Sequence, residues 1–312
     1  QESRGLGDVY KRQVYVPNLS ENSITVIPAK KSGDTKTISL DKAPQFIGQV
    51  PGTKTVYTLL SGGNEITTIN SENDTVNDTF RFEVGASAPQ VNYRCLFTSD
   101  GSKAYFATSH QPAGVAVMKV ADHTLIKGIN VNSTSVRQFI FSAAMDKINC
   151  IDPDMGQIYI ISVSSDGLLS TIKVPESFVY AELNTDSGNY FMAESGSSAA
   201  VKEFNPNTQE FVRRINDVTD SIVKLVLSED KTKLYVLGSN ELVIIDLTDD
   251  SIEDRINLDY SSPTDFQFLP DGKKLLIPSA DSDLIMILDP YDYSTDDVID
   301  TGDGPGEMII FK

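Results

Sequence analysis

Apolar and polar positions alternate in short runs along this chain, and the same arrangement returns about every 44 residues. In its first copy, Val14, Val16, Ile24 and Val26 alternate with polar positions and flank the turn-forming run at 17–22. A period of two residues places successive side chains on opposite faces of a strand. Each copy therefore predicts a strand, a polar loop and an antiparallel second strand.

Each repeat predicts four strands, with a tight turn between the first and the second. Glycine or a short acidic residue at these turns tolerates a positive φ. The turns lie at 51–54, 100–103, 145–147, 186–188, 229–231 and 271–273. The third strand is an apolar run, as at 158–161, 242–245 and 284–288, which predicts burial on both faces, whereas the polar fourth strand suits an outer edge. No window has helical spacing over three turns, so we expect an all-β chain.

The first strand of the first repeat is missing from the N-terminal end. The segment 307–311 has the composition of that strand and is expected to pair beside 14–17. This pairing closes a ring, so the predicted fold is an all-β, seven-bladed β-propeller of four-stranded antiparallel blades. The expected blade limits are 14–42 with 305–312, 43–85, 86–132, 133–176, 177–218, 219–260 and 261–304.

Several short motifs recur at matching places in the repeats. They are Val14-Tyr15-Val16-Pro17-Asn18, the Gly-Lys-Tyr spacings at 52–57 and 101–105, and the Ile-Asp and Leu-Asp pairs at 245–246 and 288–289. In these motifs the chain resembles YVTN-type β-propeller repeats over nearly all of 14–312, although Pro17 stands where that pattern has threonine. This broad group includes surface-layer-like binding proteins, lactonase-like hydrolases and cofactor-dependent oxidoreductases, so the resemblance implies the fold and leaves the function open.

The net charge of the chain bears on the kind of partner it can bind. The 312 residues include 44 acidic and 26 basic ones, a net charge of −18, which disfavours nucleic acid as a partner. No apolar run reaches the length of about 18 residues that a membrane-spanning helix needs.

Cys95 and Cys150 stand in apolar runs and are expected to be buried free thiols, with a single bridge between neighbouring repeats as the alternative.

Residues 1–13 do not follow the repeat pattern, and 8–13 looks like the translation of a sequencing adapter. We therefore expect a non-native segment on a metagenomic gene fragment, with the true start and any leader or anchor lost upstream. The expected location, outside the cell or on its surface, follows from the resemblance to surface-layer-like propellers described above.

In a propeller the loops after the second and fourth strands gather around one mouth of the central channel. Aligning the first strands places Phe46 and either Glu307 or Met308 near this mouth, together with the predicted ligand-binding residues. These are Arg94, Gln138, Tyr180, Lys224, Asp265 and Glu307, with His110 in a neighbouring loop. Mixed charge and aromatic side chains suit a small-ligand pocket. The alternative is a satisfied polar network of the charged members around channel water.

The sequence contains few candidates for catalytic or metal-binding residues. His110 and His123 fall on opposite faces, and no Gly-x-Ser-x-Gly elbow is present, so a nucleophile with a general base is not indicated. Asp281 and Asp283 are the best metal candidate because alternate carboxylates in one loop can converge on calcium; no other cofactor is expected.

We therefore predict a non-catalytic binding or interaction module whose partner is a small molecule or a protein. One alternative is a lactonase-like hydrolase or another propeller enzyme, in which His110, Arg94, Asp265 and Glu307 would be the catalytic candidates. The other alternative is a structural protein that self-assembles into a surface layer or filament through its exposed outer strands.

Overall fold

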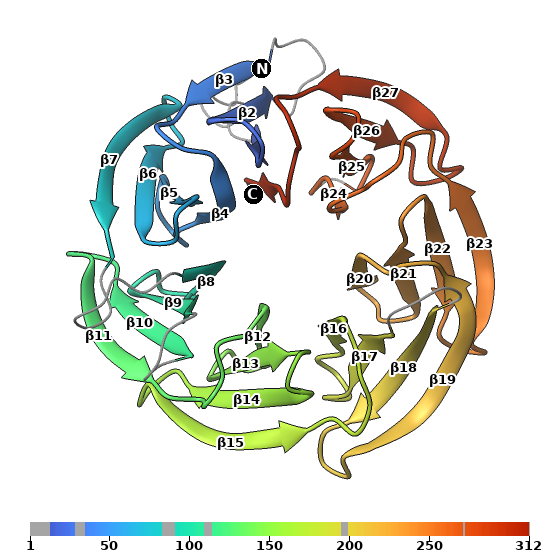
Figure 1. Cartoon of the computed structure of the whole chain (residues 1–312). Coiled ribbons are helices and arrows are strands. Elements are labelled where there is room, and N and C mark those ends of the chain that lie inside the picture. Colours follow the sequence, from blue (N-terminus) through green and yellow to red (C-terminus); the bar gives the residue numbers. More distant parts are fainter. Residues whose placement is uncertain are drawn as a thin grey trace, which may run out of the picture.

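Seven four-stranded antiparallel sheets surround a central axis like the blades of a propeller (Figure 1). The computed structural model describes residues 13–28, 35–82, 91–108, 114–194, 199–270 and 272–311. These residues form 28 strands and no helix. The prediction of an all-β, seven-bladed propeller is thus confirmed.

Each blade runs from an inner strand at the axis to an outer strand at the rim. In this order the strands are, in blade 1, β28 (Ile309–Ile310), β1 (Gln13–Asn18), β2 (Ser23–Pro28) and β3 (Lys36–Ser39); in blade 2, β4 (Pro44–Gln49), β5 (Thr55–Leu60), β6 (Glu65–Asn70) and β7 (Thr75–Arg81); in blade 3, β8 (Val91–Phe97), β9 (Lys103–Thr108), β10 (Val115–Lys119) and β11 (Thr124–Ile129); in blade 4, β12 (Gln138–Phe141), β13 (Lys147–Asp152), β14 (Gln157–Ser162) and β15 (Gly167–Lys173); in blade 5, β16 (Tyr180–Leu183), β17 (Tyr190–Ala193), β18 (Ala199–Asn205) and β19 (Glu210–Thr219); in blade 6, β20 (Lys224–Leu227), β21 (Lys233–Leu237), β22 (Glu241–Asp246) and β23 (Ser251–Asn257); in blade 7, β24 (Gln267–Phe268), β25 (Leu275–Ser279), β26 (Leu284–Leu288) and β27 (Thr295–Asp300).

Burial follows the predicted order of the strands. The apolar third strands β14 and β22 are buried along almost their whole length, because neighbouring blades cover both of their faces. The outer strands β7 and β27 are mostly exposed. The hydrophobic cores lie in the seams between blades; in one of them Phe191 and Val201 of blade 5 pack with Leu225 and Val243 of blade 6.

The ring closes where the last strand joins the first blade, as predicted. Strand β28 pairs antiparallel with β1, with Ile310 opposite Val14 and Ile309 opposite Tyr15. The Phe311 ring packs edge-on against Tyr15 with a centroid distance of 4.9 Å. The strand is shorter than the expected 307–311, because the Met308 amide donates to Asp265 of blade 7 at 3.0 Å instead of to β1.

Two other expectations have a clear outcome. Cys95 and Cys150 are both buried and free, which confirms the predicted thiols, and burial raises the pKa of each thiol well above its usual value. None of the described segments forms a helix long and apolar enough to cross a membrane. The adapter-like residues up to 12 and the loop with His110 lie outside the described residues.

Candidate functional site

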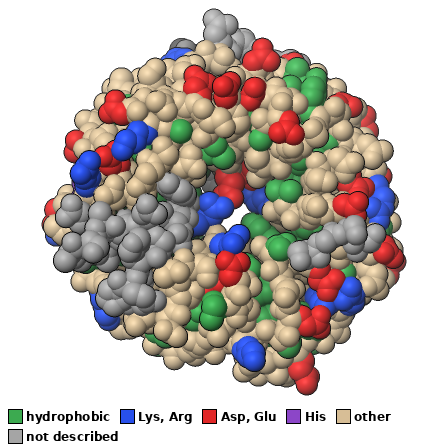
Figure 2. Space-filling model, in the orientation of Figure 1, with side chains coloured by type: hydrophobic (Ala, Val, Ile, Leu, Met, Phe, Trp, Pro, Cys, Tyr) green, Lys and Arg blue, Asp and Glu red, His purple; other side chains and the backbone are tan. Residues whose placement is uncertain are grey.

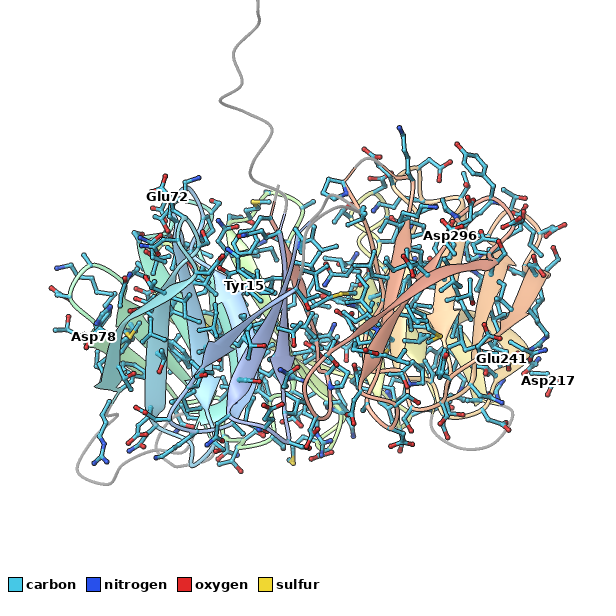
Figure 3. The ribbon with its side chains drawn as sticks, turned by 90° about the horizontal axis from the view of Figure 1, so that it is seen from above. Tyr15, Glu72, Asp78, Asp217, Glu241 and Asp296 are labelled. Atoms are coloured by element: carbon cyan, nitrogen blue, oxygen red, sulfur yellow. The ribbon has the colours of Figure 1, made fainter. Side chains whose placement is uncertain are left out.

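The candidate site is the mouth of the central channel. Basic and acidic side chains gather at the rim of the central opening on the face shown in Figure 2. In the side view, Asp217 and Glu241 lie toward one face of the disc, and Glu72 and Asp296 lie toward the opposite face (Figure 3). The blades thus separate two sets of loops, and the candidate residues of the inner strands lie between them.

A pocket of about 250 Å³ opens at the mouth. Apolar groups cover much of its wall, and a few polar groups converge on it. The lining residues are Pro17, Leu19, Gln45, Phe46, Arg94, Val223, Pro263, Thr264, Gly306 and Glu307. They come from blades 1, 2, 3, 6 and 7 and from the segments that precede β20, β24 and β28. A small concave site with few polar groups is typical of small-molecule binding.

A glycine-rich turn positions Glu307 in this pocket. A Cβ on Gly302 would lie 2.8 Å from Cγ of the buried Asn18 side chain, so glycine lets the turn pack closely on the end of β1. Gly304 has a φ of +65°, a conformation that glycine adopts without strain. Thr264 Oγ donates to the Pro305 carbonyl at 2.8 Å, which ties the turn to blade 7.

Arg94 and Glu307 form a loose ion pair across the pocket. Arg94 Nη2 lies 3.3 Å from Glu307 Oε1, and the two side chains are 36% and 51% exposed. Arg94 Nε also donates to the Arg137 carbonyl at 2.9 Å. The Arg137 guanidinium is in turn paired with Asp154 at 2.8 Å, and both of these side chains are exposed. Exposed pairs of this kind contribute about 0–1 kcal/mol, so a ligand can exchange for either carboxylate.

The second ion pair, Lys224 with Asp265, is far less accessible. Asp265 is fully buried, and Lys224 Nζ contacts its carboxylate. The same carboxylate accepts hydrogen bonds from the amides of Phe266 at 2.8 Å and Met308 at 3.0 Å. Burial raises the pKa of Asp265, and the Lys224 ammonium opposes that rise. Asp265 therefore acts as a structural link between blade 7 and the C-terminal segment, and Lys224 is the member of the pair that faces the channel.

Gln138 and Tyr180 stand farther around the channel. The Gln138 side-chain amide donates to the Ala181 carbonyl at 2.8 Å and joins blades 4 and 5. Burial is the main cause that raises the pKa of Tyr180, followed by the negative charges of Glu182 and Glu307. Its hydroxyl therefore stays protonated and can donate a hydrogen bond.

The predicted residues thus separate into groups. The structure brings Arg94 and Glu307 together in the pocket and sets Lys224, Asp265, Gln138 and Tyr180 in the channel wall, whereas His110 lies outside the described residues. The sequence placed either Glu307 or Met308 near the mouth. In the structure Glu307 lines the pocket, and Met308 is buried.

Asp281 and Asp283 each accept a hydrogen bond from another segment of the chain. Asp281 accepts from the Ser262 hydroxyl, and Asp283 accepts from the Gly304 amide at 2.8 Å. Within the described ranges, no three His, Cys, Asp or Glu side chains are grouped so that they could hold a metal ion. The calcium site stays a prediction.

Sequence reasoning missed Arg137 near the mouth and Glu182 deeper in the channel wall. Arg137 directly precedes Gln138, so the first-strand alignment pointed to its neighbour. Glu182 follows Tyr180 by two residues and lies on the same face of β16, a spacing that could have revealed it. Burial raises the pKa of Glu182 to about 6.

Comparison with known proteins supports the fold. No protein-family model matches the chain, and neither does any curated protein sequence. Among solved structures, a periplasmic gluconolactonase of Pseudomonas aeruginosa has a TM-score of 0.72 and 17% identity, over 96% of this chain and 99% of that chain. Hydrazine synthase of Kuenenia stuttgartiensis has a TM-score of 0.69 and 16% identity, over 85% and 88%. The dihydro-heme d1 dehydrogenase NirN has a TM-score of 0.67 and 12% identity, over 99% and 77%. At these identities the likeness is one of fold.

Proposed function

We propose that the channel mouth binds a small anionic organic molecule, with Arg94 as its principal contact. The observation that carries the proposal is the Arg94 guanidinium, which lines an open pocket, pairs loosely with Glu307 and donates to the Arg137 backbone carbonyl. The exposed Arg137 guanidinium, paired with Asp154, and Lys224 in the channel wall are two further basic groups. In a chain with 44 acidic and 26 basic residues, a site where three basic side chains balance three carboxylates is a local exception.

The ion pairs at the mouth favour ligand exchange. Glu307 and Asp154 hold the two guanidinium groups loosely, and a carboxylate or phosphate on a ligand can replace either of them with a bidentate contact. Leu19, Phe46 and Val223 supply an apolar wall for the carbon skeleton of the ligand. A pocket of about 250 Å³ suits a molecule of sugar-acid size better than a large cofactor.

The hydrolase alternative concerns the same mouth. It has support from the whole-chain likeness to a gluconolactonase, because a lactone opens to the hydroxy acid that such a site would bind. Hydrolysis adds water to the ester carbonyl, breaks the ring C–O bond and leaves a carboxylate and a hydroxyl. Arg94, Asp265, Glu307 and His110 stay the candidate catalytic residues, and location outside the cell stays a prediction.

Calorimetric titration with gluconate tests the binding proposal. We expect wild type to bind gluconate, and Arg94→Ala to weaken binding by roughly 10–100-fold, because a hydrogen bond to a charged group contributes about 1.5–3 kcal/mol. Arg81→Ala is the matched control, since Arg81 is an exposed arginine on the outer strand β7 that pairs with Glu65 of β6. The Arg81→Ala variant should bind gluconate with the affinity of wild type.

Two results would count against this function. Wild type that binds neither gluconate nor a phosphorylated sugar acid contradicts the proposed ligand class. Equal losses in Arg94→Ala and Arg81→Ala indicate a nonspecific charge effect. Acid release from gluconolactone, recorded in a pH-stat, separates the hydrolase alternative: a rate that wild type has and Arg94→Ala lacks supports it.

A further inference from the structure

The outer strands of blades 3 and 4 each expose two large apolar side chains, more than the other outer strands of the ring do. Strand β11 reads TLIKGI and β15 reads GLLSTIK, so each also carries one lysine and no acidic residue. Leu125 and Ile126 on β11 and Leu168 and Leu169 on β15 are exposed. Four large apolar side chains thus face solvent on two consecutive blades.

These two strands form a continuous part of the rim. Lys127 Nζ of β11 donates to the Ser165 carbonyl in the turn before β15 at 3.4 Å, and the strands follow one another around the ring (Figure 1). Outer strands present unpaired backbone groups, and natural proteins usually protect such edges with charged side chains. Strand β15 has no charged side chain before Lys173, and beyond the bulge at Leu169 its edge is open to strand pairing.

A complementary edge lies across the ring. Strand β27 reads TDDVID, with Asp296, Asp297 and Asp300 and no basic residue, and its Val298 is exposed. Figure 1 shows β27 on the side of the ring opposite β11. Asp296 is paired with Lys274 of its own blade, and Asp297 and Asp300 repel a second β27 edge. A strand that carries lysine and apolar side chains instead complements β27 in charge and in apolar contact.

We propose that a second copy of this chain docks the outer edge of its β27 against the outer edge of β15. Lys173 would meet the aspartates of β27, and Leu168 and Leu169 would be covered by the partner strand. Because the two edges are different surfaces on opposite sides of the ring, each added copy presents a new free edge. Head-to-tail association therefore continues into an open chain of propellers.

Sedimentation velocity on the full chain across a concentration series tests this association. We expect wild type to form species that grow with concentration. Lys173→Glu makes the β15 edge acidic like the β27 edge, and Asp297→Lys with Asp300→Lys makes the β27 edge basic like the β15 edge. Each variant alone should therefore lose about tenfold or more in association. An equimolar mixture of the two variants should associate again, because the acidic β27 of one meets the basic β15 of the other.

Leu169→Ser tests the apolar contribution against a matched control. Leu169 and Val212 are 55% and 52% exposed, and both lie on outer strands, but Val212 belongs to β19 of blade 5. We expect Leu169→Ser to weaken association by about tenfold and Val212→Ser to leave it unchanged, with thermal midpoints that show both variants folded. Wild type that stays monomeric, a variant mixture that does not associate, or equal effects of the two serine substitutions would overturn the proposal.

Discussion

At the residue scale, the channel wall contains a carboxyl group whose ionisation is set by its surroundings. Glu182 follows Tyr180 on the inner strand β16 and is partly buried. Burial raises its pKa to about 6, against the opposing effects of the Leu227 amide at 3.5 Å and the positive charges of Lys224 and Lys231. The folded protein therefore holds this proton more tightly than the unfolded chain does.

The stability of the protein should consequently fall as the pH rises through the pKa of Glu182. An acid with a raised folded pKa stabilises the fold below its unfolded pKa, and that contribution is lost as the pH rises from about 4.5 through about 6. Glu182→Gln cannot ionise, so relative to it wild type should lose on the order of 1–2 kcal/mol of unfolding free energy between pH 4 and pH 7. Urea unfolding at both pH values measures this loss, with the exposed Glu229→Gln as control. Parallel profiles of wild type and Glu182→Gln would contradict it.

At the element scale, a tyrosine and an aspartate join neighbouring blades. The turns between third and fourth strands place Asp74 and Asp166 in left-handed conformations, with φ of 60° and 49°. Each carboxylate accepts the hydroxyl of a tyrosine from the second strand of the preceding blade, Tyr15 for Asp74 and Tyr105 for Asp166. The local turn thus aims a charged acceptor across the seam, where a charge-assisted hydrogen bond is strong.

The seam between blades 2 and 3 is built differently. His123 occupies the left-handed turn position with a φ of 59° and stacks on Phe80 at a centroid distance of 3.8 Å. The Tyr57 hydroxyl donates to the Val120 carbonyl at 3.5 Å, which is a long contact. An aromatic stack therefore replaces the carboxylate contact in this seam, and burial lowers the pKa of His123, which favours its neutral form.

Removing the tyrosine hydroxyl should expose this difference between the seams. Tyr105→Phe takes a donor from the buried Asp166 carboxylate and should lower the unfolding free energy by about 1.5–3 kcal/mol. Tyr57→Phe removes only the long contact to a carbonyl, and its cost should stay below about 1 kcal/mol. Chemical denaturation of both variants at neutral pH measures the two values, and equal costs would show that the carboxylate adds nothing across the seam.

At the scale of the whole molecule, stability depends on joining the two ends of the chain. Phe311 belongs to the core between blades 1 and 2, where it packs with Tyr15 and Ile38 of blade 1 and with Ile47 and Val56 of blade 2. The last described residue is therefore a core residue, and a contact between distant parts of the sequence holds the ring closed.

Truncating this side chain should weaken the entire ring. Phe311→Ala should lower the unfolding free energy by about 3–5 kcal/mol, as expected for a buried aromatic side chain. Tyr291→Ala is the control, because Tyr291 is 89% exposed and its loss should change stability by no more than about 0.5 kcal/mol. Urea unfolding monitored by circular dichroism compares the two variants. A loss in Phe311→Ala as small as that of the control would mean that closure contributes little.

The sequence by itself determined the strands, the seven blades and the pairing of the C-terminal strand with β1, because these depend on local alternation and a repeat that can be counted. The pocket could not be derived in this way. Its lining comes from five blades, and Arg94 meets Glu307 of the C-terminal segment only once the ring is closed. Likewise, β28 ends early because Met308 binds Asp265, and the pKa of Glu182 depends on burial by other blades. Such contacts and solvent exposures are properties of the closed ring, so only the tertiary structure decided them.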